Sequence, residues 1–400
     1  MSETPGAGPP GTPTTLFDHA LRLHRLTPDA PLFRGGAPFP GAERRRGGPE
    51  RKASLAPTRD GADADADAVK VLDEYFDGTD DDTDGDTDVV RPATPHELAE
   101  RLRGLPVSAR HHERISGAAL RAPAGRTREA GRWLVRHGTD TGSVAIGLAL
   151  LAEAGTVADI GRIQTIGLLS NAFGPLVARA LERLPGGVEA LIWLAERATE
   201  WGRVHAVEAL CRHVDDHPAV RPWLLRNAAA DGEFLNSYVA SDAARVTGLH
   251  DVVVDARTDA AVVDQTGRIL HVMTYCEGMG TSLRHYPHAL TVMEAHVRHL
   301  GHLGPTAERY CDATTVSRYL GAETPAWSDD DGLQARWDDV RRSYVDLLGR
   351  TEWRDAAREG LAAGHARLTW LVDSVAPELG LRASLAAEGD RPCADPLPGA

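Results

Sequence analysis

Five histidines gather between residues 285 and 302, and they are the side chains most suited to chemistry in this sequence. They are His285, His288, His296, His299 and His302, and the last three recur at every third residue. Imidazoles on one helix face can hold a transition metal, and His288, His296 and His299 are the candidate ligands. A step of three also turns His302 away from His296 on a helix, which favours a histidine stripe facing solvent or an interface.

Other catalytic motifs are absent from the sequence. It contains no His-Glu-x-x-His and no Glu-x-x-His, the second being the ligand spacing of helical di-iron proteins. It has no Gly-x-Ser-x-Gly motif and no P-loop, and Gly278-Met279-Gly280 lacks the third glycine of a dinucleotide-binding turn. Cys276 lies near Glu277 and His271 but matches no known Cys/His arrangement. We therefore predict no catalytic residue and no cofactor.

An aspartate-rich stretch, residues 80–88, fits the first half of a calcium-binding loop. Aspartates stand at positions 1, 3 and 5, and Gly85 at position 6 permits the tight turn around the ion. Position 12 is Arg91 instead of a bidentate Glu, and Pro92 follows it. Such a loop would bind calcium weakly, and any aspartate-rich stretch matches the pattern by chance.

The segment Trp201–Leu210 has the most informative pattern in the chain. Trp201, His205, Glu208 and Arg212 recur at steps of four, three and four, opposite an apolar stripe that includes Val204. A polar and aromatic face beside a core face is typical of the binding surface of a helical solenoid. An ordinary Glu208–Arg212 pair, with Trp201 packed at a joint between helices, explains the same residues. The predicted binding surface joins this segment to polar and aromatic residues of the segments that follow: Trp201, Arg203, His205, Glu208, Trp223, Arg226 and Asn236.

Composition and charge favour a helical protein with a protein or peptide partner. Apolar residues make up 42% of the chain but aromatic residues only 5%, which favours close helix packing. The net charge of −14 argues against binding to nucleic acid or to an anionic membrane. The longest apolar run, Val144–Ala152, is far shorter than the roughly twenty residues of a membrane span. Without a signal-like apolar stretch in residues 1–15 or a C-x-x-C motif, we expect a cytoplasmic protein with reduced thiols.

The spacing of the expected helices predicts a repeat architecture. Helix starts recur about every fifteen residues, with Gly, Pro or Asp at the joints, so alternate helices define a unit of about thirty residues. The expected starts are Ser143, Val157, Gly174, Val188, Arg203, Ala219 and Glu233. We predict an all-α fold: a HEAT-like α-solenoid of antiparallel helix pairs, with a disordered N-terminal segment and a helical C-terminal part.

Five segments follow from this pattern. Residues 1–40 form an N-terminal tail with one short helix, Leu16–Leu26, capped by Thr14 or Thr15, and residues 41–92 form a disordered acidic and Gly/Pro-rich linker with at most a transient turn at 69–76. Residues 93–252 hold the HEAT-like repeats and open with a Thr94–Glu97 capping box. Residues 253–385 form the C-terminal helical region, and residues 386–400 a flexible tail. The helices expected after residue 252 are 260–274, 287–300, 306–320, 330–348 and 353–375.

Two short sequence motifs within residues 93–252 carry a resemblance to a known family. The chain resembles bacterial HEAT-like proteins in which W-G-[RK]-x-H-x-V-E-x-L precedes W-L-L-R, here Trp201–Leu210 and Trp223–Arg226. The resemblance extends from residues 16–40, through Gly131–His137, to about residue 320, and skips residues 41–92. Some of these proteins carry the label limonene hydroxylase, which implies oxidation of a terpene with haem, non-haem iron or flavin. The resemblance brings no catalytic residue with it.

The functional prediction is a helical-repeat binding or scaffold protein without a catalytic site. The alternative is an oxygenase acting on a small apolar substrate, with His288, His296 and His299 as metal ligands. A third hypothesis is an accessory subunit that its acidic segment tethers to a partner.

Overall fold

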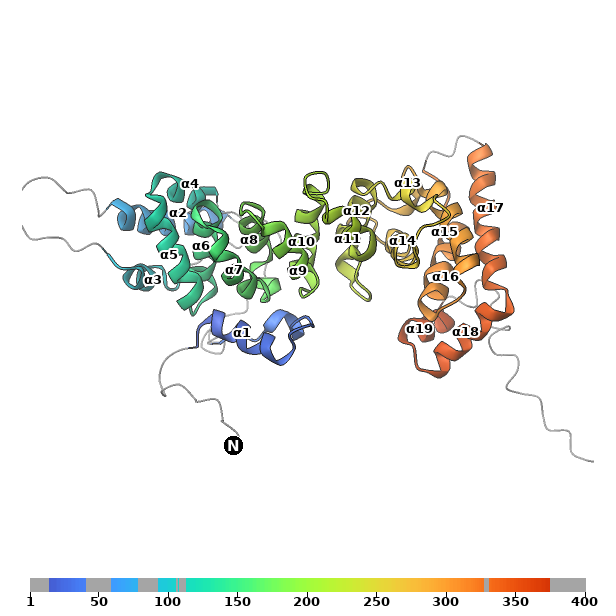
Figure 1. Ribbon diagram of the computed structural model, residues 1–400, viewed down its shortest axis with the longest axis horizontal. Helices are drawn as coiled ribbons and strands as arrows, with labels where there is room; N and C mark the ends of the chain where they lie inside the picture. The colour runs from blue at the N-terminus through green and yellow to red at the C-terminus, as the bar shows by residue number, and fades with distance from the viewer. Residues whose placement is uncertain are drawn as a thin grey trace, which may run out of the picture. The chain divides into compact units, whose positions relative to one another are not determined.

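The chain is helical and divides into two compact units. The computed structural model describes residues 14–40, 59–77, 93–105, 107, 113–326 and 331–374, and the regular secondary structure of these residues is entirely helical (Figure 1). The units are Met1–Val220 and Arg221–Ala400. The predicted all-α class is confirmed. The division at Val220 differs from the change of architecture expected near residue 252, because residues 221–252 pack with the helices that follow them.

Helices of the first unit pack in two interleaved series. In chain order they are α1 (Leu16–Leu26), η1 (Phe33–Gly36), α2 (Arg59–Asp77), α3 (Pro95–Leu102), α4 (Glu113–Arg121), α5 (Ala124–His137), α6 (Thr141–Ala154), η3 (Val157–Asp159), α7 (Ile160–Gly167), α8 (Ser170–Glu182), α9 (Gly187–Ala195) and α10 (Glu200–Arg212). From α2 to α10, each even-numbered helix packs against the next even-numbered one, and from α3 to α9 the odd-numbered helices do the same. The pairs α5/α6, α7/α8 and α9/α10 join the two series.

Helix α6 explains the longest apolar run of the sequence. It packs against α4, α5 and α8, and buried residues occur on all of its sides. A helix that is apolar all round is a core helix. Asp140 caps it by accepting a hydrogen bond from the Ser143 N–H at 3.0 Å.

Residues 14–40 belong to the first unit. Helix α1 has the predicted bounds, and Thr15 caps it by accepting from the Asp18 N–H. The helix packs on α5 and α7, and Asp18 pairs with Arg136 of α5 at 2.9 Å. His19 then contacts the Gly36 carbonyl oxygen at 2.8 Å. The segment predicted as a tail is therefore docked against the unit from residue 14 onwards.

Helix α2 corrects the prediction that residues 41–92 lack structure. It places Leu72 and Tyr75 in a core shared with α3, α4 and α5. Arg126 of α5 stacks over the Tyr75 ring at 4.3 Å and donates to the Tyr75 carbonyl oxygen at 2.7 Å. The prediction rested on the high Asp and Ala content of this stretch and overlooked the apolar residues that recur within it at helical spacing. The rest of the predicted linker, with the calcium-like stretch 80–88, lies outside the described residues, as does the predicted tail 386–400.

The second unit also contains two series of helices. In chain order they are α11 (Val220–Asn227), η4 (Phe234–Tyr238), α12 (Ala240–Val246), α13 (Leu249–Val253), α14 (Ala260–Met273), η5 (Leu283–His285), α15 (Ala289–Leu303), α16 (Ala307–Ala322), α17 (Asp331–Leu348), α18 (Thr351–Ala362) and α19 (Ala366–Ser374). Helices α12, α14 and α16 pack in succession, as do α13, α15 and α17, and α18 and α19 pack on α16. The single helix expected over residues 353–375 is two helices, because Gly364 adopts a left-handed conformation with φ of 76°.

Candidate functional site

Helix α10 has the two-sided character that its sequence predicts. Val204, Val207 and Leu210 are buried in the first unit. Trp201, His205 and Glu208 are partly exposed and Arg212 is exposed, so the polar stripe follows the steps of the sequence pattern. Trp201 and His205 stack with their ring centroids 6.0 Å apart.

Two glycines allow α8 and α10 to approach closely beneath this stripe. A Cβ atom on Gly202 would lie 2.2 Å from the Ser170 Cβ, and one on Gly174 would lie 2.9 Å from the Gly202 Cα. No side chain fits at either position without moving a helix. The sequence pattern placed both glycines at joints between helices, but they lie inside α8 and α10 and form the contact between them.

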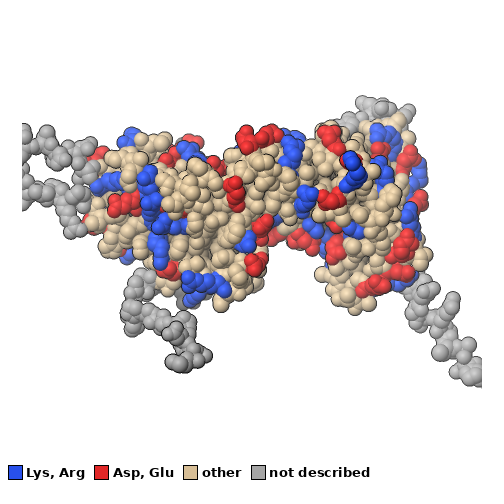
Figure 2. Space-filling view, in the orientation of Figure 1, with Lys and Arg blue, Asp and Glu red and all other residues tan. Residues whose placement is uncertain are grey.

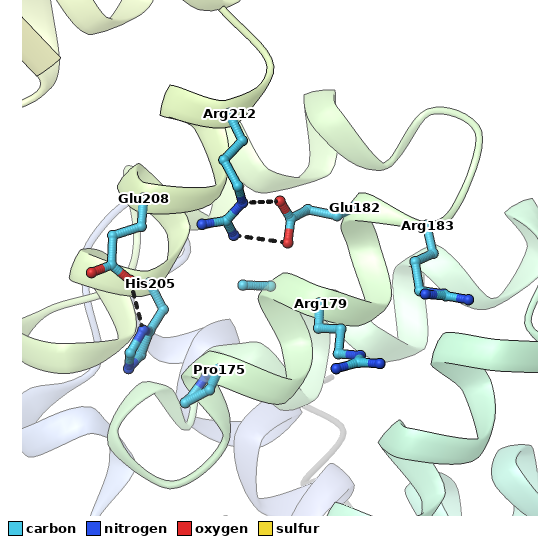
Figure 3. Close-up of a pocket in the computed structure, with 8 residues that line it drawn as sticks. Pro175, Arg179, Glu182, Arg183, His205, Glu208 and Arg212 are labelled. Atoms are coloured by element: carbon cyan, nitrogen blue, oxygen red, sulfur yellow. Dashed lines mark hydrogen bonds and ion pairs between the residues drawn. The ribbon is translucent and has the colours of Figure 1, made fainter. Parts of the chain in front are cut away.

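A pocket of about 410 Å³ lies along these two helices. Figure 3 shows the Arg212–Glu182 pair closing one side of it, with His205 and Glu208 along α10 and Arg179 and Arg183 along α8. Its lining residues are Pro175, Ala178, Arg179, Glu182, Arg183, His205, Glu208 and Arg212. The lining combines both charges with an imidazole and small apolar groups.

The ion pairs of the pocket connect the helices. Arg212 donates through Nε and Nη2 to the two carboxylate oxygens of Glu182 on α8, at 2.7 and 2.9 Å. The Nδ1 of His205 lies 3.0 Å from a carboxylate oxygen of Glu208. Arg212 thus binds across to α8 in place of the Glu208–Arg212 pair that the sequence allowed. The hydrogen bond that Arg212 donates to Glu182 raises the pKa of Arg212, so this guanidinium stays charged.

A buried carboxylate of α6 forms ion pairs with two arginines of α8 that line the pocket. Glu153 of α6, whose side chain is only 2% exposed, pairs with Arg183 at 2.6 Å and with Arg179 at 3.6 Å. Sequence reasoning missed Arg179, Glu182 and Arg183. The available signal was their Arg-x-x-Glu-Arg spacing, which places all three on one helix face.

The other predicted surface residues occupy different environments. Arg203 is buried, and its guanidinium donates to the Ala195 carbonyl oxygen at the end of α9, so it is a structural brace and not a surface residue. Trp223, Arg226 and Asn236 belong to the second unit. Arg226 pairs with Asp259 at 2.5 Å. Asn236 is buried and closes a loop through two hydrogen bonds with the Ala230 backbone.

The three candidate metal ligands are used in separate contacts. His296 is buried with its Nδ1 2.8 Å from the Tyr344 hydroxyl, and the Nε2 of His299 lies 2.8 Å from the Val253 carbonyl oxygen. His288 stacks on His250 with centroids 3.5 Å apart. Within the described part of the chain, no group of three His, Cys, Asp or Glu side chains has the arrangement of a metal site.

The second unit buries a charged cluster that the sequence did not indicate. Asp312 of α16 is hydrogen-bonded by Arg367 of α19, and the His271 Nδ1 lies 3.8 Å away from its carboxylate. Burial raises the pKa of Asp312 to about 6, although Arg367 opposes that shift. Burial lowers the pKa of His271 to about 3. Because Arg367 also approaches Asp231 at 3.5 Å, the cluster ties α19 to α16 and to the loop after α11.

Comparison of the chain with protein-family models, curated proteins and solved structures gave no match. None of the helices in the described ranges combines the length and apolar character needed to cross a membrane. The candidate sites therefore rest on geometry and chemistry alone.

Proposed function

We propose that the chain is a helical-repeat binding protein whose first unit is a HEAT-like solenoid of antiparallel helix pairs. The two interleaved series of helices support this proposal, since each helix packs on its predecessor of the same series. Stacked pairs of this kind bury their apolar stripes only against neighbours and leave ordered polar faces for recognition.

The partner in this proposal is a protein or peptide that binds along α8 and α10. The observation that carries it is the pocket in which His205 and Glu208 of α10 lie beside Arg179 and Glu182 of α8. Trp201 stacks on His205 and so extends this surface along α10. A lining of both charges suits a polypeptide, which offers backbone donors and acceptors together with charged side chains. Trp and Arg are enriched at interface hot spots, and the polar stripe of α10 contains one of each, Trp201 and Arg212.

Substitution of the α10 stripe tests this surface. We expect Trp201→Ala and the double variant His205→Ala/Glu208→Gln to weaken partner capture from extracts of the native host by about tenfold or more, the typical loss at a hot spot. The matched control is His217→Ala/Glu189→Gln, because these residues form a His–Glu pair at 2.9 Å elsewhere in the first unit.

Site-specific crosslinking gives the second measurement. A photoreactive amino acid at position 175, which lines the pocket outside the α10 stripe, should form an adduct with the captured protein, and the same residue at exposed position 216 should form none. Full capture by the stripe variants with intact helical circular dichroism would reject this surface. An adduct at 216 but not at 175 would place the binding site elsewhere.

A further inference from the structure

A row of arginines follows one face of α5 in a chain that is otherwise strongly acidic. Arg128, Arg132 and Arg136 recur at steps of four and so lie above one another on the helix. Figure 2 shows Lys and Arg side chains in a row over the region of α5. Together with Arg162 of α7, they line a hollow of about 360 Å³, and its other lining residues are Gly125, Glu129, Trp133 and His137.

A buried carboxylate fixes two of these arginines. Asp159, whose side chain is fully buried, accepts from Nε and Nη2 of Arg132 at 2.6 and 3.0 Å and lies 3.3 Å from Nη1 of Arg162. The Thr156 N–H also donates to it at 2.9 Å. Burial raises the pKa of Asp159, but the hydrogen bonds from Arg132 and Thr156, together with the positive charge of Arg132, outweigh burial and hold that pKa below its usual value. The guanidinium of Arg132 is therefore held in place before any ligand arrives.

Several donors in the hollow have no described protein partner. Arg128 uses its Nε to donate to the Ala154 carbonyl oxygen at 2.7 Å, and among the described residues neither of its Nη atoms makes a contact. The Nη1 of Arg132 is also without a contact in the described part of the chain. Arg136 pairs with Asp18 through Nη1 at 2.9 Å, and its guanidinium lies over the Phe17 ring at 4.7 Å. Each uncommitted Nη group carries two N–H donors, and together they form a row of hydrogen-bond donors on one helix face.

The charge of the hollow is not balanced locally. Among the described residues, four arginines line it against one carboxylate, Glu129, and Asp159 and Asp18 reach it from neighbouring elements. Like charges four residues apart destabilise a helix by a few tenths of a kcal/mol per pair. An anionic ligand would remove this repulsion.

The spacing of the row indicates the shape of that ligand. Four residues of α-helix advance about 6 Å along the axis, so the three guanidiniums follow one another at about this interval. Alternate side chains of an extended peptide are about 6.6 Å apart. Each guanidinium can engage one carboxylate in a charge-assisted hydrogen bond, whereas a single phosphate cannot reach the whole row.

We propose that the α5/α7 hollow binds an extended acidic peptide with Asp or Glu at alternate positions. This site is separate from the α8/α10 pocket and goes beyond the function proposed for it. Arg128 should contribute most to binding, since it has no carboxylate partner among the described residues. Asp159 is the positioning residue for Arg132, whose remaining Nη1 group is a donor to the ligand.

Peptide binding to the full chain tests the proposal. The probe is a fluorescein-labelled peptide of four Asp-Ser repeats, followed by fluorescence anisotropy at 50 and 300 mM NaCl, and the control peptide has four Asn-Ser repeats. We expect the Asp peptide alone to bind, more weakly at high salt. We expect Arg128→Gln to weaken binding by about tenfold and Arg128→Gln/Arg136→Gln to weaken it further. Arg103→Gln, an exposed arginine of the same unit outside the hollow, is the matched control and should change nothing.

Four further measurements make the result decisive. A chain whose aspartates at 80–88 are replaced by asparagine is measured in parallel, so that this acidic stretch cannot compete with the probe. A peptide with Asp at every third position should bind less well than the alternating one. No binding to either chain, equal binding by Arg128→Gln, or displacement of the peptide by a 12-nucleotide DNA at lower concentration than by unlabelled peptide would overturn the proposal.

Because Arg128 lies outside the α8/α10 pocket, Arg128→Gln should leave partner capture at that pocket unchanged, which separates the two proposals.

Discussion

At the scale of single residues, the second unit depends on a buried carboxylate, that of Asp312. Asp312 is balanced by Arg367, and His271 and His296 are held neutral nearby by burial, which lowers the pKa of each to about 3. A buried charge that loses its partner is far more costly than an exposed one. The cluster therefore provides two predictions that depend on single side chains.

Removing the partner of Asp312 should destabilise the second unit. We expect Arg367→Met to lower the free energy of unfolding by about 3–5 kcal/mol, because it leaves a buried carboxylate unpaired. The double variant Asp312→Asn/Arg367→Met should recover much of that loss, since no buried charge remains. Urea unfolding followed by circular dichroism measures both. Equal losses in the single and double variants would show that the ion pair does not govern stability here.

The buried histidines predict loss of stability in acid. In the unfolded chain His271 and His296 bind protons as the pH falls through about 6.5, whereas in the folded chain they stay neutral until about pH 3. The unfolded state thus binds more protons between these values, and the free energy of unfolding falls by up to about 1.4 kcal/mol per pH unit for each histidine.

Asp312 acts in the opposite sense and reduces that slope. Its pKa is about 6 when folded against 3.8 in the reference state, so the folded chain takes up this proton first as the pH falls. Two histidines outweigh one carboxyl group, and the net effect remains destabilising. Urea midpoints at pH 7.5, 5.5 and 4.5 should fall in that order, and His296→Gln should flatten the trend. A midpoint that does not change with pH would contradict the neutral, buried histidines.

At the scale of elements, helix packing in the first unit depends on positions where a side chain does not fit. We expect Gly202→Ala to lower the free energy of unfolding by about 1–3 kcal/mol, and with it the melting temperature, because the helices would be overpacked. The added Cβ would lie 2.2 Å from the Ser170 Cβ. Gly161→Ala is the matched control, because Gly161 is also helical and nothing lies within 4 Å of the added Cβ. That variant should be neutral or slightly stabilising. Similar melting temperatures for both variants would refute the close contact of α8 and α10.

The sequence predicted local helix signals better than contacts between helices. The bounds of α1 and the Thr94–Glu97 capping box follow from residues three or four positions apart, and both predictions are confirmed. The stripe on α10 is also local. However, Arg212 of this stripe pairs with Glu182, which lies thirty residues earlier in the chain, and no pattern within one helix specifies that pairing. Helix α2 was missed because its burial depends on α3, α4 and α5, which local composition does not reveal.

At the scale of the whole molecule, the chain contains two separate sets of internal contacts. We expect Leu72→Ala to destabilise the first unit by about 2–5 kcal/mol, because it removes a fully buried side chain of α2. Hydrogen exchange measured by mass spectrometry should then rise in α2 to α6 and stay unchanged in α14 to α17. Leu270→Ala, a fully buried change in α14, should show the reverse. Faster exchange in both units with either variant would mean that they unfold together.

The contact between Arg367 and Asp312 also determines the order in which the two units can fold during synthesis. Helix α16 leaves the ribosome well before α19, so Asp312 has no counter-ion from Arg367 until residue 367 has been made. Translation proceeds at about 5–20 residues per second, and for that interval the interior of the second unit cannot close around a charged Asp312. The first unit has no such dependence on α19 and can complete its core earlier. A ribosome stalled shortly before codon 367 should therefore hold a nascent chain with a protease-resistant first unit and a protease-sensitive second one.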